Sequence, residues 1–573
     1  MERRVLLAIF LCFLVLYVWQ ALFVKPVPRR PASSTASSSP APAATTSPSE
    51  ISPAASGAVS EPPAPTATAT PVLGATAEQD YQVENRHVVA VFTNRGARLK
   101  SWKLKAYHDR NQRPLELVAT QLASTGSLAF SLRLPDAART ATLNNALYFV
   151  QDRTLPSNAV KFEYRDAAGL VVTKEFRLDA DAYTITAQIA VSDEGQQLAP
   201  AIEWGPGLGD SDSQVGRSAV APGGITSAGG KVTRVAAQSV ASQPAQEGEF
   251  DYAGIEDHYF LSLALKPGPA KITYRAVSIP APQGSKEPAR EYVDYALEPA
   301  RRDLPLVFYV GPKDFETLAA IDRNLVKAIN FGMFSVIVVP LLRSLNWIHG
   351  FVGNYGWSIV VLTMILNLVL FPLNHKSVVS MRKMQEIQPE MKAIQARYAK
   401  LKATDPERQK MNQEMMALYR ERGVNPASGC VPILLTLPIF LAFYALLTTA
   451  IELRGAPFIG WIRDLSQPDA YYVMPILVGV SQVWLQWMTP QTGVDPTQQR
   501  MMMIMPIVLI FVFVSTPAGA LIYWLVQNVW RVVQQSLTNY LIGPPAVRTV
   551  RPAAERQLKR VGTGKTEGAA RES

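Results

Sequence analysis

The stretch TMILNLVLFPL, residues 363–373, places one carboxamide in the middle of an otherwise apolar run. A buried amide without a hydrogen-bond partner costs roughly 2–7 kcal/mol, depending on the reference state. Asn367 therefore needs either a partner on a neighbouring helix or access to a wet cavity. The surrounding run, 351–373, is long enough to cross a bilayer and predicts a membrane-spanning helix.

Further apolar runs bring the number of predicted spans to six. The N-terminal segment 1–24 predicts an uncleaved transmembrane anchor, because its apolar run is longer than a signal-peptide core and ends in bulky residues. A cleaved signal peptide is the alternative. The remaining predicted spans are 430–450, 471–489, 502–516 and 520–541.

The basic residues indicate an orientation. Residues 375–429 hold eleven Lys/Arg against six Asp/Glu, and residues 541–573 hold seven against three. Because cytoplasmic loops carry an excess of Lys and Arg, we expect both segments and both termini in the cytoplasm. The formal charge of +10 also fits nucleic-acid binding, but its concentration beside apolar runs favours the membrane interpretation.

The chain between the first two spans divides into three parts. Residues 25–80, with eleven prolines, predict a disordered tether. Residues 81–318 alternate apolar and polar residues and predict an all-β periplasmic β-sandwich. Residues 319–350 predict an interfacial amphipathic helix that Pro340 interrupts. At the other end of the chain, 543–573 is a basic cytoplasmic tail.

Residues 375–429 are too polar to span the membrane and predict a cytoplasmic helical hairpin. The second helix of this hairpin starts at a capping signal, Thr404 to Glu407, and ends near Gly423. Methionine surfaces adapt to varied apolar partners, so the hairpin methionines are a candidate client surface. The alternative is that they only pack the two hairpin helices together. The candidate residues are Met381, Met384, Met411 and Met415. The fold class is thus a multi-domain membrane protein with an α-helical core, 351–542.

Polar residues recur inside three predicted spans. The candidate groove residues are Thr363, Asn367, Thr436, Gln527 and Arg531. Spacings of four put Thr363 and Asn367 on one helix face, and Tyr523, Gln527 and Arg531 on another. Either these groups join helices while Arg531 snorkels to the membrane surface, or the faces line a hydrated cavity.

Enzyme signatures are absent from the sequence. There is no GxSxG elbow and no zincin motif, and the five histidines are scattered, so we expect no catalytic residues, no metal and no cofactor. GTGKT at 562–566 lacks the first glycine of a phosphate-binding loop, because position 559 is Lys559. Nucleotide hydrolysis is therefore not predicted.

Several long motifs resemble the YidC family of membrane protein insertases, in the long form with a periplasmic domain. They are GVNPASGCVPILLTLPIFLAFYALL (423–447), DPTQQRMMMIMPIV (495–508) and TPAGALIYWLVQN (516–528). The resemblance implies insertion of nascent membrane proteins into the bacterial inner membrane, alone or beside the Sec translocon and its accessory subunits. It also implies a hydrophilic groove, open to cytoplasm and lipid, with Tyr523 and Trp524 as client contacts. The ribosome, targeting factors and membrane lipids are further candidate partners, without specific nucleic-acid binding.

One position departs from the family pattern. The family carries a groove arginine where this sequence has Asn367, so the amide keeps the groove polar but supplies no fixed charge. We hypothesise that Arg531 supplies the charge instead. Two other functions remain open: a channel or secondary transporter, although no internal repeat is found, and an assembly factor that binds through its β domain.

Overall fold

The computed structural model describes residues 71–109, 111–120, 127–151, 156–205, 207–208, 221–279, 290–301, 305–398, 407–423, 431–488 and 496–542. The predicted anchor 1–24, most of the tether and the tail 543–573 lie outside these ranges. The described chain divides into two compact units. One holds Thr66–Arg382 with Ala427–Pro545, and the other contains Lys383–Pro426.

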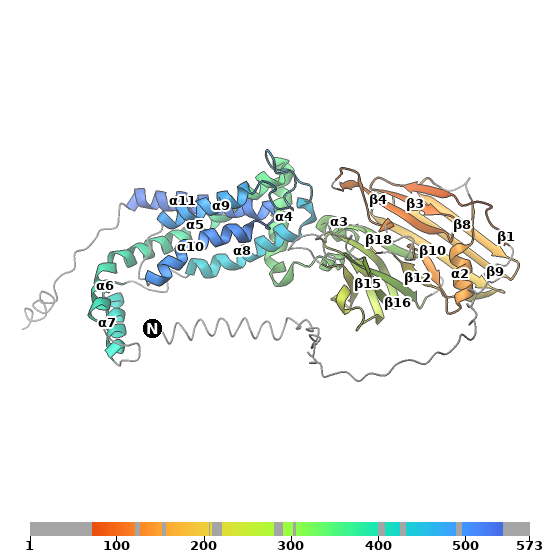
Figure 1. The fold of residues 1–573 in the computed structure, drawn as a ribbon, viewed down its shortest axis with the longest axis horizontal. Coiled ribbons are helices and arrows are strands. Elements are labelled where there is room, and N and C mark those ends of the chain that lie inside the picture. The colour runs from red at the N-terminus through yellow and green to blue at the C-terminus, as the bar shows by residue number, and fades with distance from the viewer. Residues whose placement is uncertain are drawn as a thin grey trace, which may run out of the picture. The chain divides into compact units, whose positions relative to one another are not determined.

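The β domain consists of two sheets in the described residues (Figure 1). The four-stranded sheet contains β2 Asp80–Glu84, β3 Val88–Thr93, β4 Arg98–His108 and β5 Pro114–Glu116. The fourteen-stranded sheet contains β1 Pro71–Leu73, β6 Ser131–Arg133, β7 Phe149–Val150, β8 Ala159–Asp166, β9 Leu170–Leu178, β10 Thr184–Asp193, β11 Gln196–Leu198, β12 Ala201–Trp204, β13 Gly223–Ala228, β14 Lys231–Ala236, β15 Ala245–Glu256, β16 Phe260–Ile279, β17 Arg290–Pro299 and β18 Leu306–Pro312. The described strand pairs are antiparallel, as the alternating sequence predicts.

Aromatic side chains fill the space between the two sheets. Phe92 of β3 stacks on Phe176 of β9 with ring centroids 4.7 Å apart. Trp102 of β4 donates its indole N–H to the carbonyl of Val310 in β18, at 3.0 Å. Because strand side chains alternate between faces, every second residue of β9 is buried and its neighbours are not. These contacts make the β domain a face-to-face sandwich.

The two halves of strand β16 pair with different strands, because β16 bends between them. Residues 260–265 pair with β18, and residues 270–279 pair with β17. Between these halves Lys266 and Gly268 have positive φ values of 47° and 71°. Glycine adopts this left-handed conformation without strain, so Gly268 lets the strand change direction.

Two features of the β domain differ from the sequence prediction. Strand β1 starts at Pro71, inside the range predicted as the tether, so the folded part begins earlier than 81. A short helix, α2 (Ala137–Asn145), interrupts the strands. Asp136 caps it by accepting a hydrogen bond from the Ala138 backbone N–H at 2.8 Å. The helix was not predicted because its nine residues carry one buried apolar side chain, Leu143, and so no helical period.

The segment after the β domain is not one helix. It forms α3 (Phe315–Ile321), two short 3-10 turns, and α4 (Ser335–Val352). Pro340 lies inside α4 and does not end it, which corrects the predicted interruption. Gly353, at φ 70°, ends α4.

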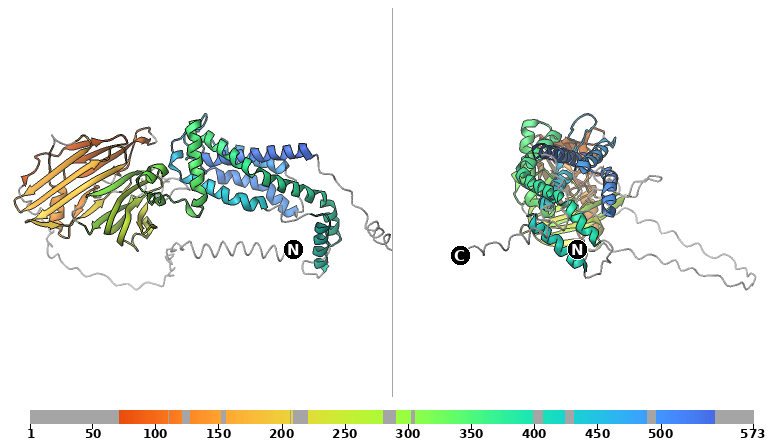
Figure 2. Two further views of the ribbon diagram at one scale, coloured as in Figure 1. Left: turned by 180° about the vertical axis from the view of Figure 1, so that it is seen from behind. Right: turned by 90° about the vertical axis from the view of Figure 1, so that its left-hand side faces the viewer.

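Five helices form the helical core: α5 Tyr355–Glu386, α8 Val431–Thr449, α9 Val473–Met488, α10 Pro496–Phe513 and α11 Ala518–Ile542. They run alongside one another in both Figure 1 and Figure 2. By length and composition, two described segments qualify to cross a membrane, Gly332–Val352 and Tyr355–Ser380. Leu437–Thr449, Val473–Met488 and Ile504–Phe513 are the shorter apolar segments among residues with described side chains, and α8 and α10 both begin before these segments.

The second unit contains two antiparallel helices, α6 (Gln388–Arg397) and α7 (Glu407–Glu421). Met391 and Met415 are buried between them, and Met384 and Met411 pack against the same cluster. Ion pairs also join the two helices, such as Arg397 to Glu414 at 2.9 Å. The predicted capping signal at Thr404 and the side chain of Met381 lie outside the described residues.

Candidate functional site

Asn367 has a partner on a neighbouring helix. Its amide Nδ2 donates to Oε1 of Gln527 in α11 at 2.7 Å and to the carbonyl of Thr363 at 2.9 Å. The Thr363 hydroxyl donates to the carbonyl of Ile359 at 2.6 Å. Thr363 and Asn367 are 1% and 2% exposed. We call Thr363, Asn367 and Gln527 the α5–α11 seam.

The α5–α11 seam lies deep inside the helical core. Asn367 follows the start of α5 by twelve residues, or about 18 Å at 1.5 Å per residue. Gln527 follows the start of α11 by nine residues, or about 14 Å. Each distance is about half the roughly 30 Å thickness of a bilayer core.

A second polar pair joins α11 to α9. Asn528 donates from Nδ2 to the hydroxyl of Ser481 at 3.0 Å, and both side chains are buried. The sequence analysis missed this pair because, on the last predicted span, it considered only the helix face that carries Tyr523, Gln527 and Arg531. A polar residue in the middle of each of two apolar runs was the available signal.

Tyr523 and Trp524 lie in an aromatic cluster with α8 and α10. Tyr523 stacks on Phe443 at 4.3 Å, and it is 7% exposed. Trp524 meets Phe440 and Phe513 edge-on, at 4.9 and 4.7 Å. Tyr523 therefore joins helices in this structure, and contact with another molecule requires α8 or α11 to move.

The other predicted groove residues lie apart from the α5–α11 seam. Arg531 is one helical turn beyond Gln527 on the same face of α11, and it is exposed. No described carboxylate lies within ion-pair distance of it. Gln534, one turn further, is buried, and its Nε2 has no described partner. Thr436 belongs to α8, but its side chain lies outside the described part of the chain.

One end of the helical core is closed by the loop 454–472. Asn354, before α5, donates to the carbonyl of Pro457 at 3.0 Å. The backbone N–H of Ala518, at the start of α11, donates to the carbonyl of Gln467 at 2.8 Å. Asp469 caps α9 by accepting from the Met474 N–H at 2.7 Å. We call this meeting of the loop with α5, α9 and α11 the closed end.

Gly356 permits the close packing at the closed end. A Cβ atom there would overlap the ring of Phe458 and lie 2.8 Å from the Phe458 Cβ. We therefore expect Gly356→Ala to lower the free energy of unfolding by about 1–3 kcal/mol. Gly350→Ala, where a Cβ atom meets nothing within 4 Å, is the matched control and should not destabilise. Thermal unfolding in detergent measures both, and equal melting temperatures would contradict this packing.

Glu452 is a titratable group beside the closed end. It lies in the short turn Ile451–Leu453, where its Oε1 is buried without a hydrogen-bond partner. Burial, and then the charge of Asp314, raise the pKa of Glu452 to about 7. Hydrogen bonds from the Phe315 backbone and the Asn346 side chain oppose this rise.

This pKa predicts that the protein loses stability as pH rises. Since the folded state binds the Glu452 proton more tightly than the unfolded chain, the stabilisation is complete below about pH 4.5 and is lost through about pH 7. Glu452→Gln should raise stability at pH 8, by on the order of 1–3 kcal/mol relative to its effect at pH 5. Unfolding curves at both pH values measure this, with exposed Glu249→Gln as control. A Glu452→Gln effect independent of pH would exclude this account.

The hairpin methionines differ in accessibility. Met415 is 4% exposed and packs α6 against α7, so it does not face outward. Met384 and Met411 are partly buried in the same cluster, whereas Met416 is 43% exposed. Packing thus accounts for Met415, as the alternative interpretation held. In the described part of the chain, no three His, Cys, Asp or Glu residues gather as metal ligands would.

Comparisons with known proteins cover both parts of the chain. Residues 80–344 match the family described as the YidC periplasmic domain, and residues 347–543 match the 60Kd inner membrane protein family. A membrane protein insertase YidC of Geotalea daltonii is 33% identical over 94% of this chain and 99% of its own length. That of Geobacter metallireducens is 32% identical over 94% and 98%. A crystal structure of an active YidC insertase with its first transmembrane domain resolved matches at 19% identity and a TM-score of 0.35, over 82% of this chain and 95% of that one.

Proposed function

This chain belongs to the YidC family of membrane protein insertases, and we propose that its α5–α11 seam receives the polar segment of a client during insertion. The observation that carries the proposal is the hydrogen bond between Asn367 and Gln527, at 2.7 Å. It joins two uncharged amides, each a little over a third of the way along its helix, α5 or α11. Such polar groups mark a path that polar atoms can follow.

The amide pair is suited to opening and closing. A hydrogen bond within a protein contributes only about 0.5–1.5 kcal/mol net, because partners are exchanged and not lost. A client backbone or polar side chain can replace Gln527 as the partner of Asn367. The seam then lowers the cost of moving polar groups through hydrocarbon, and burial of the client's apolar segment in lipid makes the process favourable.

Short helices support the same mechanism. α9 has 16 residues and α10 has 18, and α10 starts with the polar residues Thr497 to Arg500. About 20 residues are needed to cross a bilayer, and such mismatch favours local thinning. A thinner bilayer and a polar seam both lower the free-energy cost of moving the client's polar segment across the membrane.

We propose six transmembrane helices in total, with the β domain and the closed end in the periplasm and both termini in the cytoplasm. The charge excess of 375–429 and 541–573 supports this orientation. The hydrogen bonds of the loop 454–472 to α5 and α11 fit a groove shut on the periplasmic side. The hairpin α6–α7 then lies in the cytoplasm, and Met416 is the exposed methionine among those of its methionines whose side chains the structure describes.

Nascent membrane proteins are the clients in this proposal, and the Sec translocon, the ribosome and lipids are the further partners. Photo-crosslinking from position 527 to a stalled nascent chain tests it. We expect adducts from 527 but not from lipid-facing Leu368, which is 64% exposed. If protein-only liposomes conduct a solute but insert no client, the result would instead favour the alternative function of a channel or secondary transporter.

The β domain is proposed to be accessory to insertion. We expect deletion of 71–312 to leave insertion of a single-span client within about twofold, because the α5–α11 seam lies wholly in the helical core. Extending the deletion through Ile321 should destabilise the core, since Phe315 lies beneath the guanidinium of Arg343 and its backbone donates to Glu452. If the shorter deletion, of 71–312, already abolishes insertion, the result would support the assembly-factor alternative.

A further inference from the structure

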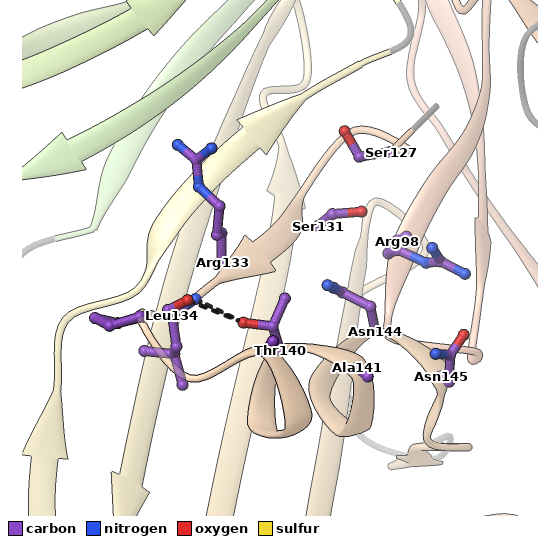
Figure 3. Close-up of a pocket in the computed structure, with 11 residues that line it drawn as sticks. Arg98, Ser127, Ser131, Arg133, Leu134, Thr140, Ala141, Asn144 and Asn145 are labelled. Carbon is purple, nitrogen blue, oxygen red and sulfur yellow. Dashed lines mark hydrogen bonds between the residues drawn. The ribbon is translucent and has the colours of Figure 1, made fainter. Parts of the chain in front are cut away.

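A cavity of about 480 Å³ lies in the β domain between helix α2 and strands β4 and β6 (Figure 3). This volume falls within the range of small-molecule sites. The lining residues used below are Arg98, Ser131, Leu134, Ala141 and Asn145.

Arg98 brings an uncompensated positive charge to the cavity. Its Nε donates to the carbonyl of Arg95 at 3.1 Å, and no described carboxylate lies within ion-pair distance of it. The nearby carboxylate of Glu78 is already paired with Arg95 at 2.8 Å. Burial, and then the charge of Arg95, lower the pKa of Arg98. An anion beside Arg98 would remove this unfavourable arrangement.

A second basic side chain lies behind this strand. Lys174 is fully buried, and its Nζ donates to the carbonyls of Gly96 at 2.7 Å and Phe130 at 2.9 Å. It has no described carboxylate partner. Burial lowers the pKa of Lys174 well below its usual range, so Arg98 is the basic side chain on which the cavity's preference for an anion depends.

Ser131 adds a hydrogen-bonding group to the cavity. It is 1% exposed, and its Oγ has no described partner. In Figure 3 its hydroxyl lies on the side of Arg98, whereas Arg133 points the other way. Arg133 is 3.5 Å from Glu203, so its charge is already matched.

Two further polar side chains of the lining are already engaged. Thr140 accepts from the Leu134 N–H at 2.9 Å, and Asn144 donates to the Leu132 carbonyl at 2.7 Å. A sugar would bury several hydroxyls here with few partners, which is costly. A ligand with one anionic end and a small apolar body fits this lining better.

We propose that this cavity binds the carboxylate of a short peptide. Arg98 pairs with the carboxylate, Ser131 donates to it from the floor of the cavity, and Asn145 contacts the adjoining amide. Leu134 and Ala141 contact the apolar side chain.

Titration of N-acetyl-alanyl-alanine into the detergent-solubilised full-length protein tests the proposal by calorimetry. We expect saturable binding at pH 7, and at least about tenfold weaker binding of the uncharged C-terminal amide of the same peptide. Arg98→Gln should weaken binding of the peptide acid by a similar factor, and Ser131→Ala should weaken it by about threefold. Arg133→Gln is the matched control, expected to stay within about twofold.

Equal affinity for the acid and the amide would overturn the proposal. So would full affinity in a folded Arg98→Gln variant. If the Arg98→Gln variant does not fold, the proposal is judged by the affinities of the unaltered protein for the peptide acid and for its C-terminal amide. Displacement of the peptide by equimolar sulfate or glucuronate would overturn the peptide assignment in favour of a general anion or sugar-acid site.

Discussion

Replacing both amides of the α5–α11 seam, by Asn367→Leu together with Gln527→Leu, will slow insertion of a client with a charged translocated tail by about tenfold or more. The protein will stay folded, because removing both partners leaves no unsatisfied buried group. Each single substitution will destabilise more than the double one, by about 1–3 kcal/mol, since it leaves one buried amide without its partner. A client whose translocated tail is short and uncharged will insert at nearly the unaltered rate.

Reconstituted vesicles and a protease-protection readout measure these rates. The matched control is Gln535→Leu with Asn539→Leu, which removes another amide contact of α11, at 3.2 Å, between side chains outside the seam. If the seam and control variants slow charged-tail insertion equally, the seam has no special role. Equal slowing of both clients by the seam variant would indicate general damage to the helical core.

Arg531→Gln will slow insertion of an acidic-tailed client by about tenfold and leave a neutral-tailed client within about twofold. Arg531 is exposed one turn beyond Gln527 and has no described carboxylate partner. It is therefore available to attract a client's acidic group toward the seam. Such attraction is electrostatic and weakens as salt rises, so the difference between the two clients should shrink at high ionic strength.

The double variant Arg531→Gln with Asn367→Arg tests whether charge position matters. If Arg531 supplies the positive charge that Asn367 lacks, moving the arginine to position 367 should restore acidic-client insertion. Unaltered insertion of the acidic client by Arg531→Gln alone would exclude this role for Arg531.

The helices of the core could be predicted from sequence because each is an apolar run bounded by polar or turn residues. Their partners could not. Asn367 and Gln527 are 160 residues apart, and no local pattern fixes which helix faces meet. The α9–α11 pair, Ser481 with Asn528, was missed for the same reason. The family resemblance indicated a groove, but not that Tyr523 is buried against Phe443.

The β domain shows the same limit. Alternating residues predicted antiparallel strands, since burial on one face imposes a period of two. The cavity beside Arg98 depends on α2, a helix without a helical apolar period, and on side chains from three separate elements. Only the folded chain brings these groups together.

Cysteine labelling tests the central claim that water reaches the α5–α11 seam from the cytoplasmic side. With the native Cys12 and Cys430 replaced, Gln527→Cys in inverted vesicles should react with a membrane-impermeant thiol reagent, and more strongly while a client is being inserted. Leu368→Cys, at similar depth but facing outward, should stay unreacted. Position 527 remaining as unreactive as 368, with and without client, would contradict the account.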